Sequence, residues 1–189
     1  AHLAAATVAD ALQAMDYKLA AADFFDTLEV SAEAAVVQSL ALESGINFYY
    51  PTEGSVRMSF DEVTTPEEVA EVIRIFAAAK GRKAKAVKPV TESRVPAALR
   101  RRTAYLSEAV FNTYRSESDL MRYIKKLELR DISLANSMIS LGSCTMKLNA
   151  AALMQPLSLA GFQNMHPFAP ADQAEGYMQL ITELENDLA

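Results

Sequence analysis

The sequence predicts an α/β protein in which a small lobe precedes a mainly helical segment. Three observations carry this prediction. Through residues 1–85 the apolar residues switch between the spacing of helices and the alternation of strands, in the order helix, strand, helix, strand, strand, helix. Residues 81–93 are rich in lysine and poor in large apolar side chains, which indicates a boundary. After residue 116 only the helical spacing returns.

The lobe begins with an alanine-rich stretch, 4–18, that predicts a helix lying on a core. The apolar stripe of this helix consists of Leu3, Val8, Leu12 and Met15. Residues 24–30 alternate apolar and polar side chains in their second half, as a half-buried strand does. Ser31 is expected to cap the next helix, with Glu33 in its first turn, and Gly45 is expected to end it.

Three further elements complete the lobe. Residues 46–50 are aromatic and β-prone, residues 55–60 alternate, and a turn at 51–54 joins the two runs into a hairpin. Pro66, preceded by threonines and followed by acids, predicts the start of a helix that continues over 69–80. We therefore expect a compact lobe with a small, mostly antiparallel sheet.

Beyond the lobe, a connector over 86–115 leads into the helical segment 116–189. Its basic part, 94–103, fits a solvated, mobile linker better than an anion-binding stretch. Ser116 and the acids after it predict the start of one helix, and residues 174–188 predict another. The apolar stripes are Leu120, Met121, Ile124 and Leu127 on the first helix, and Tyr177, Leu180, Ile181, Leu184 and Leu188 on the second. We expect these faces to pack on domains outside the chain and to be exposed within it.

Composition excludes several classes of function. With 51% hydrophobic residues the chain can bury a core, and a net charge of −6 opposes a general nucleic-acid or membrane-surface role. One cysteine permits no internal disulfide, and the Cys/His spacing of a zinc site is absent, so no metal is predicted. The single cysteine fits a reducing cytoplasm, and neither a signal peptide nor a run of roughly 18 apolar residues is recognised. The missing initial Met and an end in mid-helix predict an internal fragment.

The stretch 136–149, NSMISLGSCTMKLN, is the one that looks built for chemistry. Ser143, Cys144 or Thr145 could act as a nucleophile with His166, although a hydrolase is disfavoured because the chain has only two histidines. The backbone amides after Gly142 could instead form an anion-binding nest, with Lys147 adding charge. A buried turn with its hydroxyl groups satisfied internally is an equal alternative.

Two other places could hold a ligand. The loop 161–176 contains prolines that stiffen it, and Phe162 and Phe168 are expected to anchor it, so that His166 either faces a ligand or packs under a proline turn. Arg57 lies in a predicted strand, where its guanidinium could clamp a carboxylate or, on an edge, remain solvated.

Several stretches, in order, resemble the glycine dehydrogenase (decarboxylating) family, the P-protein of the glycine cleavage system. They are FFDTLEV (24–30), INFYY (46–50), RMSFDE (57–62), VFNTYRSESDLMRYIKKLELRDISL (110–134), NSMISLGSCTMKLN (136–149) and NMHPFAPADQAEGY (164–177). The last three are highly specific. The sequence departs from the family at Ser140, where proline is usual, and near Glu108, Ala109 and Arg115, where the family tends to have histidine or proline.

The resemblance implies a duplicated fold-type I protein that depends on pyridoxal 5′-phosphate. Residues 1–85 would be the small C-terminal lobe of the first half, 86–115 the connector between halves, and 116–189 the start of the second half. The family's Schiff-base lysine, in a histidine-lysine motif further downstream, has no counterpart here, and Lys147 belongs to a different motif. The isolated segment is therefore expected to be inactive and to bind no cofactor covalently.

The family's reaction implies the remaining expectations. The full-length enzyme would release CO₂ from glycine and pass the aminomethyl group to the lipoyl group of the H-protein, as a homodimer or pseudo-dimer of halves, in the cytoplasm of a bacterium or in a mitochondrial matrix. The residues expected to line its cleft are Ser143, Cys144, Thr145, Lys147, Asn149 and His166. The alternative is a noncatalytic α/β binding or dimerisation module.

Overall fold

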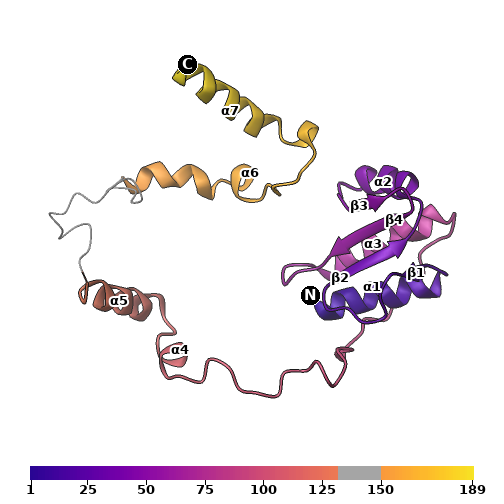
Figure 1. Cartoon of the computed structure of the whole chain (residues 1–189), viewed down its shortest axis with the longest axis horizontal. Coiled ribbons are helices and arrows are strands. Elements are labelled where there is room, and N and C mark those ends of the chain that lie inside the picture. Colours follow the sequence, from indigo (N-terminus) through magenta and orange to yellow (C-terminus); the bar gives the residue numbers. More distant parts are fainter. Residues whose placement is uncertain (132–149) are drawn as a thin grey trace. The chain divides into compact units, whose positions relative to one another are not determined.

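The computed structural model describes residues 1–131 and 150–189, and its helices and strands are shown in Figure 1. The chain divides into two compact units, Ala1–Arg102 and Thr103–Ala189. We describe each unit by itself.

The first unit is built on a four-stranded sheet with the strand order β1-β2-β4-β3. Every pair of neighbouring strands is antiparallel, and the central pair runs in continuous register from Thr27 opposite Ser59 to Ser31 opposite Ser55. The strands are β1 Lys18–Leu19, β2 Thr27–Ser31, β3 Tyr49–Thr52 and β4 Ser55–Ser59. This arrangement confirms the predicted antiparallel sheet.

Three helices supply most of the rest of the core: α1 His2–Ala14, α2 Ala34–Glu43 and α3 Pro66–Ala79. In Figure 1, α3 lies behind β2 and β4. Leu28 and Val30 of β2 are buried, as are Val56 and Met58 of β4, whereas the residues between them are at least partly exposed. The sheet therefore has one apolar face, and all three helices contribute to the same buried cluster with it. At its centre Phe76 is 0% exposed, a position where truncation to alanine costs about 3–5 kcal/mol.

All three helices of this unit end in the same way. Each is followed by a residue with positive φ: Asp16 (63°), Gly45 (68°) and Gly81 (64°). In α2, the Gly45 amide donates to the Leu42 carbonyl at 3.0 Å and the Ile46 amide to the Ala41 carbonyl at 2.9 Å, which is the Schellman pattern. The equivalent pairs of bonds end α1 and α3. The predicted helix end at Gly45 is thus confirmed.

The predicted start of α2 is wrong by two residues. Ser31 is the last residue of β2, and the helix has Glu33 as its N-cap without a side-chain cap. The cause is strand pairing, because the Ala32 and Ala34 amides donate to carbonyl groups of the β3–β4 turn at 3.0 and 2.9 Å. Those bonds continue the ladder past Ser31 and leave its side chain no capping role.

The other elements differ from the predictions mainly at their ends. The hairpin is present, but its turn is shorter than predicted, because β3 continues through Pro51 to Thr52. Proline is tolerated there because β3 is an edge strand. The predicted start of α3 is confirmed: Thr65 and Glu68 form a capping box and Pro66 is the first helical residue. The two-residue strand β1 was not predicted.

The described part of the second unit is helical. Its elements are α4 Val110–Thr113, α5 Glu117–Glu128, the 3₁₀ helix η1 Ala151–Ser158, α6 Ala160–Gln163, the 3₁₀ helix η2 Ala171–Gln173 and α7 Glu175–Leu188. Ser116 caps α5 as predicted, with its hydroxyl accepting from the Asp119 amide at 3.2 Å. Neither α5 nor α7 contains a buried residue, and their apolar stripes are exposed as expected, except at Tyr177, which is half-buried.

Candidate functional site

Most of the predicted site lies in a part of the chain that the structure does not describe. Ser143, Cys144, Thr145, Lys147 and Asn149 all fall outside the described residues. Their roles therefore stay predictions, and His166 alone can be placed.

His166 lies in the loop between α6 and η2 and is exposed. The Phe168 amide donates a hydrogen bond of 3.0 Å to its Nδ1, and the Ala169 amide donates to its backbone carbonyl at the same distance. Because Nδ1 accepts, the proton of a neutral ring is on Nε2. The loop thus presents an imidazole with an N–H donor rather than a buried, packed ring.

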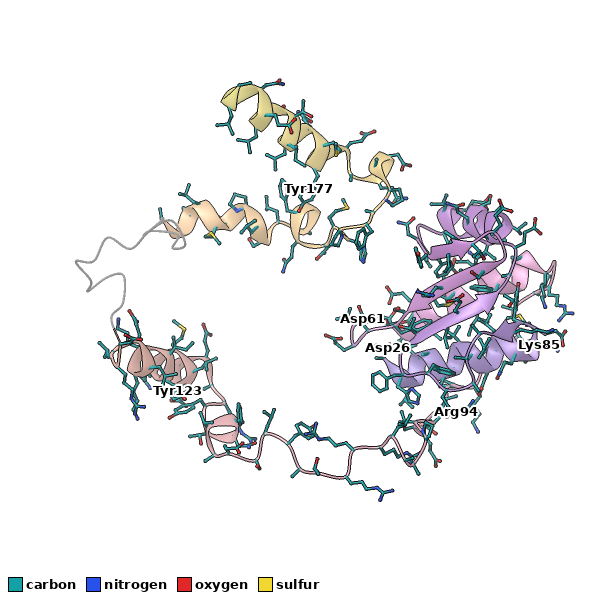
Figure 2. The ribbon with its side chains drawn as sticks, in the orientation of Figure 1. Asp26, Asp61, Lys85, Arg94, Tyr123 and Tyr177 are labelled. Carbon is teal, nitrogen blue, oxygen red and sulfur yellow. The ribbon has the colours of Figure 1, made fainter. Side chains whose placement is uncertain are left out.

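Of the two residues predicted to anchor this loop, Phe162 does so and Phe168 does not. The Tyr177 hydroxyl group of α7 donates to the Phe162 carbonyl at 2.7 Å, and the two rings meet edge to face at 5.4 Å (Figure 2 labels Tyr177). The Phe168 side chain is 90% exposed, with its ring tilted against that of His166 at 5.9 Å. The prediction for Phe168 is wrong, because among the described residues no apolar surface covers that ring.

Arg57 is already paired within the sheet. It lies on the open face of β4, an inner strand, and its Nε and Nη2 donate to the same oxygen of Glu29 at 3.0 and 2.6 Å. Its guanidinium also lies over the Tyr49 ring, 5.5 Å from the centroid. The local carboxylate of Glu29 occupies the donors that an external carboxylate would need.

The predicted basic connector is partly tied to the first unit. Arg94, labelled beside α1 in Figure 2, forms a two-pronged ion pair with Asp10. Arg100 donates to the backbone carbonyls of Val95 and Ser93 at 2.7 and 2.9 Å. These two arginines have hydrogen-bond partners within the chain itself.

Two carboxyl groups have a lowered pKa, and in both the cause is hydrogen bonding within the chain. Hydrogen bonds from Arg74 and Ser44 lower the pKa of Glu71 to about 2, and a hydrogen bond from Thr64 lowers that of Asp61.

Among the described residues no group of three His, Cys, Asp or Glu side chains could hold a metal ion. No helix in that part of the chain is long and apolar enough to cross a membrane.

The fold is that of a mixed α/β segment, in which an antiparallel sheet with one buried apolar face is followed by helices. Within it, residues 1–76 match the family model described as the glycine cleavage system P-protein. The chain is also 47% identical over 99% of its length to a glycine dehydrogenase (decarboxylating) of Flavobacterium johnsoniae, covering 20% of that protein. Proteins of the same name from Bacteroides thetaiotaomicron and Thermosynechococcus vestitus are 46% and 42% identical over 94% and 100% of the chain, which covers 19% of each.

The chain is thus homologous, over nearly its whole length, to glycine dehydrogenase (decarboxylating), the family of the glycine cleavage system P-protein. It spans about one fifth of the length of the curated relatives it matches.

Proposed function

We propose that the chain is the middle part of a glycine decarboxylase that depends on pyridoxal phosphate. The observation that carries the proposal is the identity of 42–47% to glycine dehydrogenases (decarboxylating) across almost all of the chain. The whole protein would release CO₂ from glycine and transfer the aminomethyl group to the lipoyl group of the H-protein. It would act as a homodimer or as a pseudo-dimer of its halves.

The fold supports a division of the chain within such a protein. Residues 1–85 would be the small lobe that closes the first half of a fold-type I enzyme, and their one-faced sheet with helical cover fits such a lobe. Residues 86–115 would connect the halves, and the helical residues 116–189 would begin the second half.

Bound pyridoxal phosphate would supply the electron-accepting ring on which the carboxyl group of glycine is lost. This chain would supply donors for anionic groups, because hydroxyl groups, backbone amides near Gly142 and the Lys147 ammonium group have the chemistry that binds phosphate and carboxylate. His166 adds an exposed Nε2–H donor from a second loop. The residues proposed to line the cleft, where they position glycine and exclude water, are Ser143, Cys144, Thr145, Lys147, Asn149 and His166.

One experiment tests the chain itself. No His-Lys pair occurs in the 189 residues, so we expect neither the absorbance band of a lysine-bound cofactor nor glycine-dependent CO₂ exchange on adding pyridoxal phosphate. Either signal from the 189-residue chain would overturn this part of the proposal.

A second experiment tests the site within the full-length protein. We expect Lys147→Met and His166→Ala each to lower the glycine–CO₂ exchange rate by about tenfold to 100-fold, because each removes a positioning donor. Lys126→Met, on the exposed surface of α5, is the matched control and should leave the rate unchanged. Unchanged rates in both site variants would remove these residues from the cleft.

The exposed apolar stripes of α5 and α7 favour one other candidate, a noncatalytic binding or dimerisation module. This candidate predicts a full-length reading frame without a lysine-bearing cofactor domain. Sequencing the gene beyond residue 189 separates the two proposals, because a downstream His-Lys motif would favour the enzyme.

A further inference from the structure

Residues 82–94 form a basic strap that runs antiparallel to α1 along the surface of the first unit. Three contacts hold it, from the C-terminal to the N-terminal end of the helix: Arg82 Nη1 with Asp16 Oδ2 at 3.2 Å, the Val90 amide with Thr7 Oγ1 at 2.9 Å, and the Arg94 amide with His2 Nε2 at 2.9 Å. Val87 also packs against the buried core cluster. The strap is therefore an ordered part of this surface.

The middle of the strap carries positive charge that the unit does not neutralise. Asp16 and Asp10 pair with Arg82 and with Arg94, at its two ends. Between them Lys83, Lys85 and Lys88 are exposed, and no carboxylate of the described residues lies within 4.0 Å of their Nζ atoms. Lys85 is labelled at the edge of the unit in Figure 2. Residues 80–102 contain nine Lys or Arg and one acid, Glu92, in a chain of net charge −6.

An apolar groove lies beside these lysines. Its volume is about 460 Å³, which is within the range of ligand-binding pockets. Its walls are formed by Leu3 of α1, by Val69 and Ile73 of α3, and by Val87 and Val90 of the strap. Lys85 also lines it. Apolar walls beside a row of cations suit a ligand that is apolar on one side and anionic on the other.

We propose that this groove and strap bind an acidic amphipathic peptide segment of a partner protein. Apolar side chains of the segment enter the groove, and its carboxylates meet Lys83, Lys85 and Lys88. Five extended residues separate the outer lysines by up to roughly 17 Å, a span that a peptide covers and a small anion does not. A nucleic acid has the anionic groups, but it has no aliphatic side chains for the groove, and the acidic remainder of the chain repels it.

Fluorescence anisotropy on the full 189-residue chain can test the proposal with three labelled peptides of equal length. The peptides combine leucine with glutamate, with glutamine or with lysine in the same pattern. We expect the Leu/Glu peptide to bind with an affinity that falls as salt is raised, and the Leu/Gln peptide to bind more weakly. We expect the Leu/Lys peptide not to bind.

Two variants locate the binding site. The triple change Lys83→Gln, Lys85→Gln and Lys88→Gln should weaken Leu/Glu binding by about tenfold, since each exposed pair contributes modestly. Ala70→Glu, at an exposed position of the groove wall on α3, should weaken it by a similar factor while the strap stays intact. The charge-matched control Arg122→Gln, Lys125→Gln and Lys126→Gln changes the surface of α5 and should alter binding less than twofold.

Three results would overturn the proposal. The first is equal Leu/Glu binding by the strap variant and by the α5 control. The second is no effect of Ala70→Glu, which would reduce the surface to a general anion attractor. The third is tighter binding of a DNA duplex or of anionic phosphatidylserine vesicles than of the Leu/Glu peptide. Circular dichroism melting of each variant confirms that the unit remains folded.

Discussion

Two tyrosines of the first unit bury their hydroxyl groups in different surroundings. The Tyr17 hydroxyl group donates to the Phe76 carbonyl at 2.8 Å, and its ring meets the Phe76 ring edge-on at 5.3 Å. The Tyr50 hydroxyl oxygen is buried without a hydrogen-bond partner among the described residues. Burial raises the pKa of both phenols.

The difference predicts opposite outcomes for the same substitution. Tyr17→Phe removes a buried hydrogen bond and should lower the free energy of unfolding by about 1 kcal/mol. Tyr50→Phe removes a desolvated hydroxyl group that gains nothing in return, and should leave that free energy unchanged or raise it by up to about 1 kcal/mol. Urea denaturation of both variants measures the contrast. A loss in Tyr50→Phe as large as that in Tyr17→Phe would mean that the Tyr50 hydroxyl group has a partner.

The ion pair between Glu71 and Arg74 makes the free energy of unfolding depend on pH in the acid range. Arg74 donates to Glu71 from the next turn of α3, with Nε at 2.7 Å from Oε2, and also reaches Ser44 Oγ at 2.9 Å. Hydrogen bonds to Glu71 from Arg74 and, to a smaller extent, from Ser44 hold its pKa at about 2, below its ordinary value of 4.5. A depressed carboxyl pKa adds stability above about pH 4.5, and that stability is lost as the pH falls towards 2.

Glu71→Gln should therefore lower the free energy of unfolding at pH 7 by only about 0.3–0.5 kcal/mol, because the pair is largely solvated. The difference between variant and parent should shrink between pH 4.5 and pH 2. Thermal melts at several pH values, at low and high salt, measure it. A difference that grows on acidification would have the wrong sign for this pair.

At the scale of elements, the left-handed residue after each helix of the first unit gives a direct test. Gly45 has φ of 68° and open space around a would-be Cβ, so Gly45→Ala brings backbone strain without a clash. We expect a loss of about 1 kcal/mol in the free energy of unfolding. Gly54→Ala is the matched control, because Gly54 has equally open space without a positive φ, and it should be neutral or slightly stabilising. Equal losses in the two variants would contradict the strain argument.

The same elements show what local sequence can specify. The start of α3 was predictable because Thr65, Pro66 and Glu68 satisfy the free amides of the first turn by themselves. The end of α2 was predictable because a left-handed position favours glycine. The start of α2 and the strand β1 were not, because both depend on pairing with residues far away in the sequence. Lys18 and Leu19 are a strand only because they lie opposite Ser31 and Val30.

At the scale of the whole molecule, the candidate site depends on the resemblance more than on physics. Residue types alone left the stretch around Ser143 open between a nucleophile, an anion nest and a buried turn. The stretch lies in a region that relatives named glycine dehydrogenase (decarboxylating) share, and its role as a cleft wall stays a prediction. His166 could be placed, and its exposed ring removes the packed-histidine alternative. The groove beside the strap could not be predicted, because its walls come from α1, α3 and residues 84–90.

The two units differ in how much core each of them buries. Amide hydrogen exchange on the intact chain can measure the consequence. The first unit buries a continuous core, whereas α5 and α7 bury no residue, so their helices have little tertiary packing to oppose opening. We expect amides of α1, α3, β2 and β4 to exchange slowest, and those of α5 and α7 to exchange within about tenfold of unstructured peptides. Strong protection in α5 or α7 would show that their apolar stripes are covered in the chain itself. Protection gained only in the full-length protein would instead show that the stripes are covered by parts outside the 189 residues, which span about one fifth of the relatives' length.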